Sequence, residues 1–163
     1  VSDAGTLKRM DYSYIKAAST PHFYAQMHSA QTISDAAWTT LSYEAEVLDS
    51  GSVYNTSTYR FTPGVIGWYY IYANLSPSNG SGMNYGAMKI RKNGSSDVAG
   101  RLHNGTEKSY LGCSVAGIAE VDDVSDYFHI EYYGESEDDS NIVPDTSSGS
   151  KRCNFFGWKI IGA

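Results

Sequence analysis

Cysteine is scarce in this chain of 163 residues, which contains only Cys113 and Cys153. Two cysteines are too few for the disulfide framework of a small secreted domain, and they lack the close spacing of a metal site. Two semi-buried free thiols are therefore the favoured interpretation, with a single bridge between them as the alternative.

Charge is also sparse, and most of it is negative. Charged residues make up 18% of the chain, with 12 Lys and Arg against 18 Asp and Glu. This balance offers no attraction to the phosphates of a nucleic acid or to an anionic membrane. The longest apolar stretch, residues 65–73, is interrupted by Gly67 and falls far short of the ~20 residues of a spanning helix. We therefore expect no nucleic-acid partner and no membrane insertion.

Catalytic motifs are missing as well. The sequence has no nucleophile elbow, phosphate-binding loop, dinucleotide fingerprint or zinc-protease motif. Glu44 and Glu46 share one face of an expected strand, which keeps a carbohydrate-active enzyme open as a minor alternative. Since no nucleophile, base and orienting group can be placed together, we predict a protein that is not an enzyme.

Calcium is the only cofactor that the sequence suggests. An acidic segment supplies carboxylates that suit Ca²⁺ from Glu135, Glu137, Asp138 and Asp139. The segment does not match the twelve-residue calcium loop of helix-loop-helix proteins, and a solvated surface loop is the favoured interpretation.

The apolar residues alternate in short runs, a pattern typical of strands, and helical periodicity is nearly absent. Runs of this kind occupy residues 22–28, 127–133 and 156–161. Turn candidates separate the runs, and they are Asn79-Gly80, Asn93-Gly94, Asn104-Gly105 and residues 49–52. The pattern predicts an all-β sandwich or barrel.

One expected strand, residues 68–75, is apolar or aromatic on both of its faces. Trp68, Tyr70 and Tyr72 form one alternating set, so that both faces require cover. A partner subunit is the simplest cover for the second face, and Tyr suits an interface because its ring buries area while its hydroxyl stays polar. The small residues of segment 112–119 would also let another surface approach closely. A central strand within a monomer is the alternative.

Two stretches resemble the complement 1q and tumour necrosis factor-like jelly-roll family. Residues 54–73 contain Phe61-Thr62-Pro63 followed by a Tyr-rich strand, and residues 154–160 resemble the terminal strand of the family. The resemblance covers residues 21–163 and implies a ten-stranded jelly-roll sandwich, a homotrimer and a binding module without catalytic residues. It also implies that the Tyr-rich and terminal strands face the threefold axis. The interface candidates are Trp68, Tyr70, Tyr72, Phe156 and Trp158.

The sequence predicts a connector over residues 1–20 and a head domain over residues 21–163. Residues 1–15 of this leader resemble the connectors that precede terminal domains of phage and marine-virus structural and fibre proteins. The chain has no initiator Met and no secretory leader, so we expect a fragment of a longer polypeptide. This resemblance implies a virion protein whose trimeric head binds a host surface molecule or glycan, or other virion proteins. A secreted, extracellular complement 1q-like recognition or adhesion module is the alternative.

The ligand of such a head would meet its outer loops. We expect these loops at residues 79–85, 94–105 and 134–149, with Tyr85 and Tyr110 as the candidates for stacking on a sugar.

Overall fold

The computed structural model describes residues 20–110, 112–144, 146 and 152–160, and only the backbone of residues 103–110. Except for Thr20, the predicted connector lies outside the described residues, so the predicted division at residue 20 stays a prediction. No helix occurs within the described ranges, and so none that could cross a membrane.

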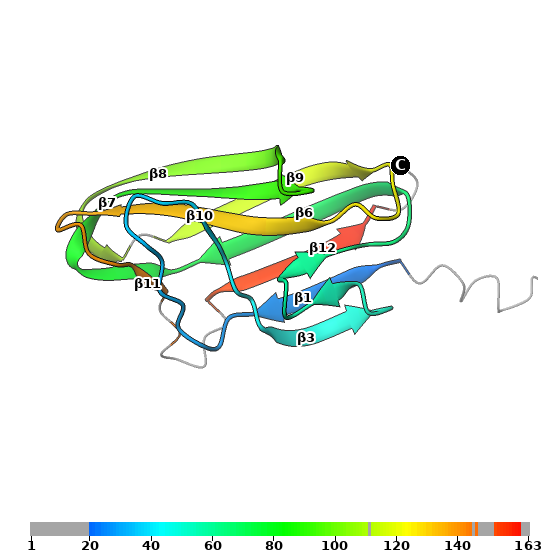
Figure 1. The fold of residues 1–163 in the computed structure, drawn as a ribbon, viewed down its shortest axis with the longest axis horizontal. Coiled ribbons are helices and arrows are strands. Elements are labelled where there is room, and N and C mark those ends of the chain that lie inside the picture. The colour runs from blue at the N-terminus through cyan, green and yellow to red at the C-terminus, as the bar shows by residue number, and fades with distance from the viewer. Residues whose placement is uncertain (1–19, 111, 145, 147–151, 161–163) are drawn as a thin grey trace, which may run out of the picture.

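The described chain forms twelve strands, joined into two antiparallel sheets (Figure 1). The longer strands are β1 (His22–Gln26), β3 (Ala45–Ser50), β6 (Gly67–Leu75), β7 (Pro77–Lys92), β8 (Ser96–Tyr110), β9 (Cys113–Val121), β10 (Phe128–Ser136) and β12 (Asn154–Lys159). Four strands of two residues complete the set: β2 (Thr39–Thr40), β4 (Tyr54–Asn55), β5 (Arg60–Phe61) and β11 (Val143–Pro144). The all-β sandwich is confirmed, whereas the described strands number twelve and the resemblance implied ten.

Sheet one has the order β3-β1-β12-β6-β9, and sheet two has the order β11-β7-β10-β5-β4. In sheet two, β8 adds to β7 and β2 adds to β10. The first and last strands of the described chain, β1 and β12, therefore lie side by side in the interior of sheet one.

Aromatic rings fill the space between the two sheets. The ring of Phe23 on β1 lies 4.6 Å from that of Tyr54 on β4, 4.5 Å from Phe61 on β5 and 4.7 Å from Phe155 on β12. Because these rings come from both sheets and pack in stacked, tilted and edge arrangements, they join the layers as well as burying apolar area.

Alternation in β6 follows the sequence pattern. Tyr69, Ile71, Ala73 and Leu75 are buried between the sheets, while Trp68, Tyr70 and Tyr72 lie on the outer side of sheet one. The prediction of a strand that is apolar or aromatic on both faces is confirmed. The outer face of this strand is only partly covered within this chain.

The tyrosines divide between the core and the outer face. Tyr43, Tyr54 and Tyr69 are buried, and their hydroxyls donate to the backbone carbonyls of Asn74, Tyr43 and Val65. Burial raises the pKa of Tyr69 to about 12, so that the phenol stays neutral and able to donate. The polar ends of these three rings are thus satisfied inside the core.

Two of the four predicted turns are confirmed. Asn93 and Gly94 join β7 to β8 with φ values of 53° and 71°, as a tight hairpin turn requires. In the turn at residues 49–52, the carboxylate of Asp49 accepts hydrogen bonds from the backbone amides of Val53 and Tyr54.

The other two predicted turns are wrong. Asn79-Gly80 lies inside β7, and Asn104-Gly105 lies inside β8. The side chain of Asn79 is buried and donates a hydrogen bond to Ser140. This asparagine therefore has a structural role within a strand and does not form a turn. Segments 79–85 and 94–105, expected as outer loops, are consequently mostly strand, and part of segment 134–149 lies outside the described residues.

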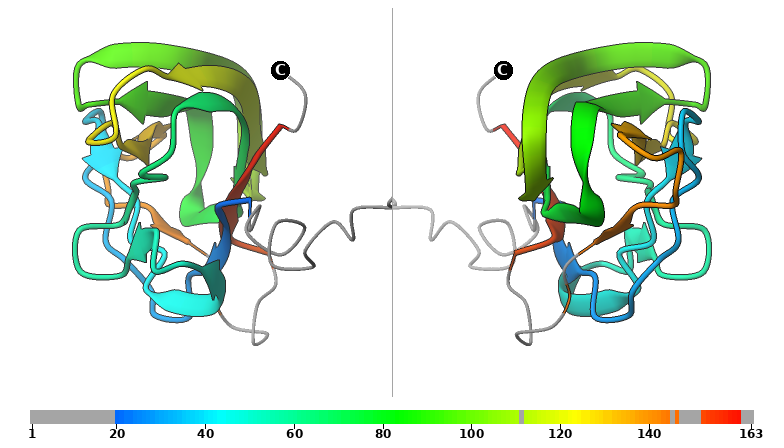
Figure 2. Two further views of the ribbon diagram at one scale, coloured as in Figure 1. Left: turned by 90° about the vertical axis from the view of Figure 1, so that its right-hand side faces the viewer. Right: turned by 90° about the vertical axis from the view of Figure 1, so that its left-hand side faces the viewer.

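The hairpin of β7 and β8 bends across one side of the sandwich (Figure 2). It brings Val98 and Ala99 of β8 against the glycine at position 117 of β9 in sheet one. The small residues of β9 do permit a close approach, and in the described chain the approaching surface is β8.

Both cysteines are buried, and neither forms a disulfide, as the favoured interpretation expected. Leu75 of β6 pairs with Cys113 on one side, and Cys153 precedes β12 on the other side of the same strand. Two strand spacings amount to roughly 10 Å, beyond the reach of a disulfide. Burial raises the pKa of Cys113 to about 12, which removes its thiolate at neutral pH.

Gly117→Ala tests the packing of the bent hairpin. A methyl group at this position would lie 2.9 Å from the Cβ of Ala99, an atom that cannot rotate away. We expect the free energy of unfolding to fall by about 1–3 kcal/mol in chemical denaturation. Gly80→Ala is the matched control, since its added methyl meets no atom within 4 Å, and a loss as large in this control would contradict the account.

Candidate functional site

The outer side of sheet one carries a continuous set of aromatic side chains, here called the aromatic face. Strand register places Tyr24, Phe156 and Tyr72 in one row across β1, β12 and β6, and Trp158 and Tyr70 in the next row. Trp68 continues the set along β6. The five predicted interface residues thus lie on one surface.

The rings of the aromatic face contact each other. Tyr72 and Phe156 stack at 4.9 Å, Phe156 and Trp158 at 5.6 Å, and Trp158 lies 4.8 Å from Tyr70. Tyr24 meets the edge of Phe156 at 6.1 Å. These contacts hold the rings as one ladder, so the face presents a preformed surface with little side-chain freedom left to lose.

The aromatic face is open to solvent. Trp68 and Trp158 are 40% and 43% exposed, and the flanking Leu48 on β3 and Ile118 on β9 are 51% and 58% exposed. Sequence reasoning missed Tyr24, Leu48 and Ile118, although Tyr24 alternates with the buried Phe23 and could have been assigned from that pattern. A hollow of about 410 Å³ adjoins the face at Tyr72 and Asn74.

Ion pairs cover much of the outer side of sheet two instead. Glu131 on β10 lies 3.3 Å from the ammonium of Lys89 and 3.7 Å from the guanidinium of Arg91, both on β7. Arg91 also binds Asp97 at 2.6 Å. The two outer surfaces of the sandwich therefore differ in kind, because one is aromatic and the other carries paired charges.

A second hollow, of about 350 Å³, lies on the outer side of sheet two. Its lining residues are Trp38, Tyr85, Tyr133 and Glu135. Tyr85 and Glu135 are cross-strand partners, so the structure brings together two residues that the sequence placed in separate predictions. The side chain of Tyr110, the other stacking candidate, lies outside the described residues.

The acidic segment is exposed and does not converge on a common point. Asp138 accepts hydrogen bonds from the hydroxyls of Ser81 and Ser140, and Glu137 lies over Gly82. Over the described ranges no three His, Cys, Asp or Glu side chains form a group that could hold a metal ion. The calcium set of Glu135, Glu137, Asp138 and Asp139 stays a prediction from the sequence, without support from this geometry.

Glu44 has a structural use. One of its carboxylate oxygens accepts hydrogen bonds from the backbone amides of His28 and Ser29, at 3.1 and 2.6 Å. Glu46 is exposed on β3 at the edge of sheet one. A carboxylate engaged by two amides stabilises a turn, and it is poorly placed to act as a general acid.

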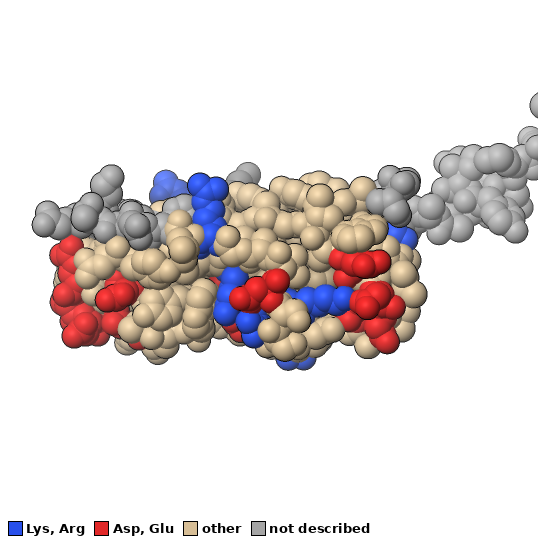
Figure 3. Space-filling view, turned by 90° about the horizontal axis from the view of Figure 1, so that it is seen from above, with Lys and Arg blue, Asp and Glu red and all other residues tan. Residues whose placement is uncertain are grey.

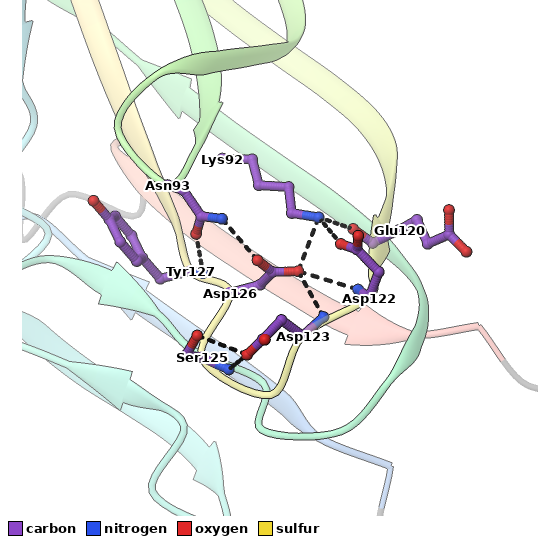
Figure 4. Close-up of polar contacts among 8 residues, drawn as sticks. All are labelled: Lys92, Asn93, Glu120, Asp122, Asp123, Ser125, Asp126 and Tyr127. Atoms are coloured by element: carbon purple, nitrogen blue, oxygen red, sulfur yellow. Dashed lines mark hydrogen bonds and ion pairs between the residues drawn. The ribbon is translucent and has the colours of Figure 1, made fainter.

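A polar network closes the loop between β9 and β10 (Figure 4). Asp126, only 4% exposed, accepts hydrogen bonds from Asn93 and from the backbone amides of Asp122 and Asp123. The ammonium of Lys92 lies 2.8 Å from the same carboxylate and also binds Asp122. Burial alone would raise the pKa of Asp126, but the hydrogen bonds from Lys92, Asn93 and the amides outweigh it and hold the pKa well below its usual range.

No model of a known protein family matches the sequence, and no curated protein matches it. Solved structures do resemble the fold. Murine APRIL in its crystal structure at pH 5.0 superposes with a TM-score of 0.64 at 10% identity, over 86% of this chain and 99% of that chain. The globular domain of the zebrafish complement 1qA protein gives a TM-score of 0.57 at 15% identity, over 86% of this chain and 97% of that chain.

The chain has the complement 1q and tumour necrosis factor-like jelly-roll fold. The resemblance found in residues 54–73 and 154–160 is therefore confirmed at the level of the fold. In this jelly roll the aromatic face is the outer side of sheet one, and the 350 Å³ hollow lies on the outer side of sheet two.

Asp126→Asn tests the polar network of the jelly roll. The change leaves Lys92 beside a buried neutral amide, and we expect a loss of about 2–4 kcal/mol in the free energy of unfolding. Since the folded pKa of Asp126 lies below its unfolded value, its contribution is present above about pH 4 and is lost as pH falls further. Denaturation curves between neutral and acidic pH should show a weaker acid dependence in the variant.

Asp122→Asn is the control for this measurement. Asp122 binds the same ammonium, but its side chain is 72% exposed, so we expect a loss below about 1 kcal/mol. Equal losses for the two variants would show that the buried carboxylate of Asp126 stabilises the fold no more than the exposed carboxylate of Asp122.

Proposed function

We propose that this chain is the head of a homotrimeric, non-catalytic recognition module, and that the aromatic face is its subunit interface. The aromatic face itself is the observation that carries the proposal. Tyr and Trp are enriched at protein interfaces because each buries a large ring while keeping one polar atom for a partner.

The exposed apolar area of the aromatic face favours a second copy of this chain as its cover. The ladder of five rings, together with Trp68 and the flanking Leu48 and Ile118, is a larger apolar surface than monomeric proteins usually leave open to water. Closed cyclic assemblies are the common way in which one chain covers such a surface with copies of itself. The jelly-roll fold agrees with a threefold arrangement, which the family resemblance implies.

The polar atoms along the aromatic face suit such an interface. Asn154 and Asn74 lie in the row next to Phe156 and Tyr72, and the side-chain oxygen of Asn74 accepts a hydrogen bond from the backbone amide of Asn154. Amide side chains can meet a symmetry-related copy without an uncompensated charge.

The sequence resemblance of residues 1–15 to viral fibre connectors favours a virion setting for the trimer. There the head would attach to a host surface molecule or glycan, or to other virion proteins. A secreted complement 1q-like recognition module uses the same trimer, and the aromatic face fits both settings equally. The reading frame upstream of Val1 distinguishes them, because a fibre or capsid region supports the first and a signal peptide with collagen repeats the second.

Trp158→Arg and Tyr72→Arg test the trimer. The wild-type protein should sediment at about three times the 17.8 kDa chain mass, and each variant should sediment as a monomer because a buried arginine at the interface would lack a partner. Analytical ultracentrifugation at micromolar concentration makes the measurement, with thermal melting to confirm that each variant folds.

Val124→Arg is the matched control, because Val124 is 58% exposed and lies in the loop between β9 and β10, which contributes no residue to the aromatic face. It should leave the trimer intact. A wild-type chain that sediments at 17.8 kDa would overturn the proposal.

A further inference from the structure

The hollow on sheet two is walled by three aromatic rings that are inclined to one another. The ring of Trp38 lies 5.6 Å from that of Tyr133 at an interplanar angle of 51°, and the ring of Tyr85 lies 5.7 Å from Tyr133 at 78°. Rings at such angles form separate walls, whereas a single flat platform would need coplanar rings.

Backbone pairing positions each wall. Tyr133 and Glu135 project from the outer side of β10, and Tyr85 projects from β7 directly opposite Glu135. Trp38 comes from the loop that runs along β10, which is tied down by a hydrogen bond from the amide of Ala36 to the carbonyl of Gly134 at 2.8 Å. Hydrogen bonds within the sheet thus position three of the four lining residues, and the fourth, Trp38, comes from the loop.

A cation already lies against Trp38 within the chain. The ammonium of Lys89 lies 3.8 Å from the centre of the Trp38 ring, and Lys89 lines the neighbouring hollow of about 290 Å³, which Trp38 also lines. Glu131 and Asp97 lie 3.3 and 3.8 Å from this ammonium and balance its charge. The indole of Trp38 thus already takes part in a cation–π contact, and two carboxylates balance the charge of that cation.

Glu135 is the only charged residue among the described side chains that line the hollow, and its carboxylate is exposed. Carboxylates also gather at the end of the molecule where the acidic segment follows β10 (Figure 3). These carboxylates repel phosphate, sulfate and acidic sugars, and they favour a positively charged ligand.

We propose that Trp38, Tyr85, Tyr133 and Glu135 form an aromatic cage that binds a methylated ammonium group such as that of choline or trimethyllysine. Aromatic faces on several sides hold the methyl groups and the diffuse positive charge, and the carboxylate adds attraction without requiring a hydrogen bond. The volume of about 350 Å³ suits a head group and lies near the lower end of small-molecule sites.

The site does not depend on the trimer. Its four residues belong to sheet two and to the loop beside it, on the opposite side of the sandwich from the aromatic face. Each chain carries a complete cage, so binding per chain should be the same in a monomeric interface variant. In a trimer, three cages would add their strength toward a ligand displayed in several copies.

The test is a titration of the full chain with choline, followed by NMR chemical shifts of the indole and backbone amides. Neutral 3,3-dimethylbutan-1-ol, which has the shape of choline without its charge, is the matched ligand control. We expect saturable shifts centred on Trp38, Tyr85 and Tyr133, with the neutral analogue at least about tenfold weaker. Phosphocholine and trimethyllysine distinguish a lipid or glycan head group from a protein source, and the negative surroundings predict weaker binding of phosphocholine.

Five variants test whether the binding depends on the cage. Trp38→Leu and Tyr133→Leu should weaken choline binding by about tenfold or more, whereas Tyr85→Phe keeps a ring and should stay within about twofold of wild type. Glu135→Gln keeps the shape and should weaken choline but not the neutral analogue. Glu137→Gln removes a nearby carboxylate that does not line the hollow, and it should bind choline as the wild type does.

Three results would overturn the proposal. Equal affinity for choline and the neutral alcohol would indicate a plain apolar hollow. Tighter binding of neutral hexoses at the same residues would assign the site to sugars. The absence of saturable shifts with choline, phosphocholine and trimethyllysine in a protein that remains folded would remove the site altogether.

Discussion

The sandwich depends on the packing of aromatic rings between its sheets, around Phe23. Phe23 and Phe155 from sheet one meet Tyr54 and Phe61 from sheet two at ring distances below 6 Å. Once these rings face inward, the twofold periodicity of a strand sends their neighbours outward. Phe156 lies outside because Phe155 lies inside, and Tyr24 lies outside because Phe23 lies inside. The core packing thus determines that Tyr24 and Phe156 lie on the outer side of sheet one.

The two outer surfaces of the sandwich differ in a way that suits different partners. On sheet one the rings of Tyr72, Phe156 and Trp158 stack on each other and leave no charge among them. On sheet two Glu131, Lys89 and Arg91 form ion pairs, and the aromatic residues there gather at the hollow beside Trp38. An extended aromatic surface suits a broad and permanent contact, and an isolated hollow suits a small ligand.

Much of the fold was predictable, and the errors have physical causes. Alternation in residues 68–75 predicted a two-faced strand because side-chain direction in a strand depends only on position along the chain. The Asn-Gly pairs were less informative, since Asn93-Gly94 turns the chain while Asn79-Gly80 and Asn104-Gly105 continue their strands. An Asn-Gly pair permits positive φ without requiring it. The partner that decided the matter at Asn79 is Ser140, 61 residues away in the sequence.

The sequence by itself determined the all-β class, the jelly-roll resemblance and five of the six rings of the aromatic face, because each rests on local alternation or on motifs within one stretch of chain. Only the tertiary structure decided which surfaces those residues join. It placed Leu48 and Ile118 at the edges of the face, separated Cys113 from Cys153 by the width of β6, and brought Trp38 to Tyr85, Tyr133 and Glu135. Such juxtapositions arise from pairing between distant strands, and the order of strands in a sheet is set by the packing of the whole core.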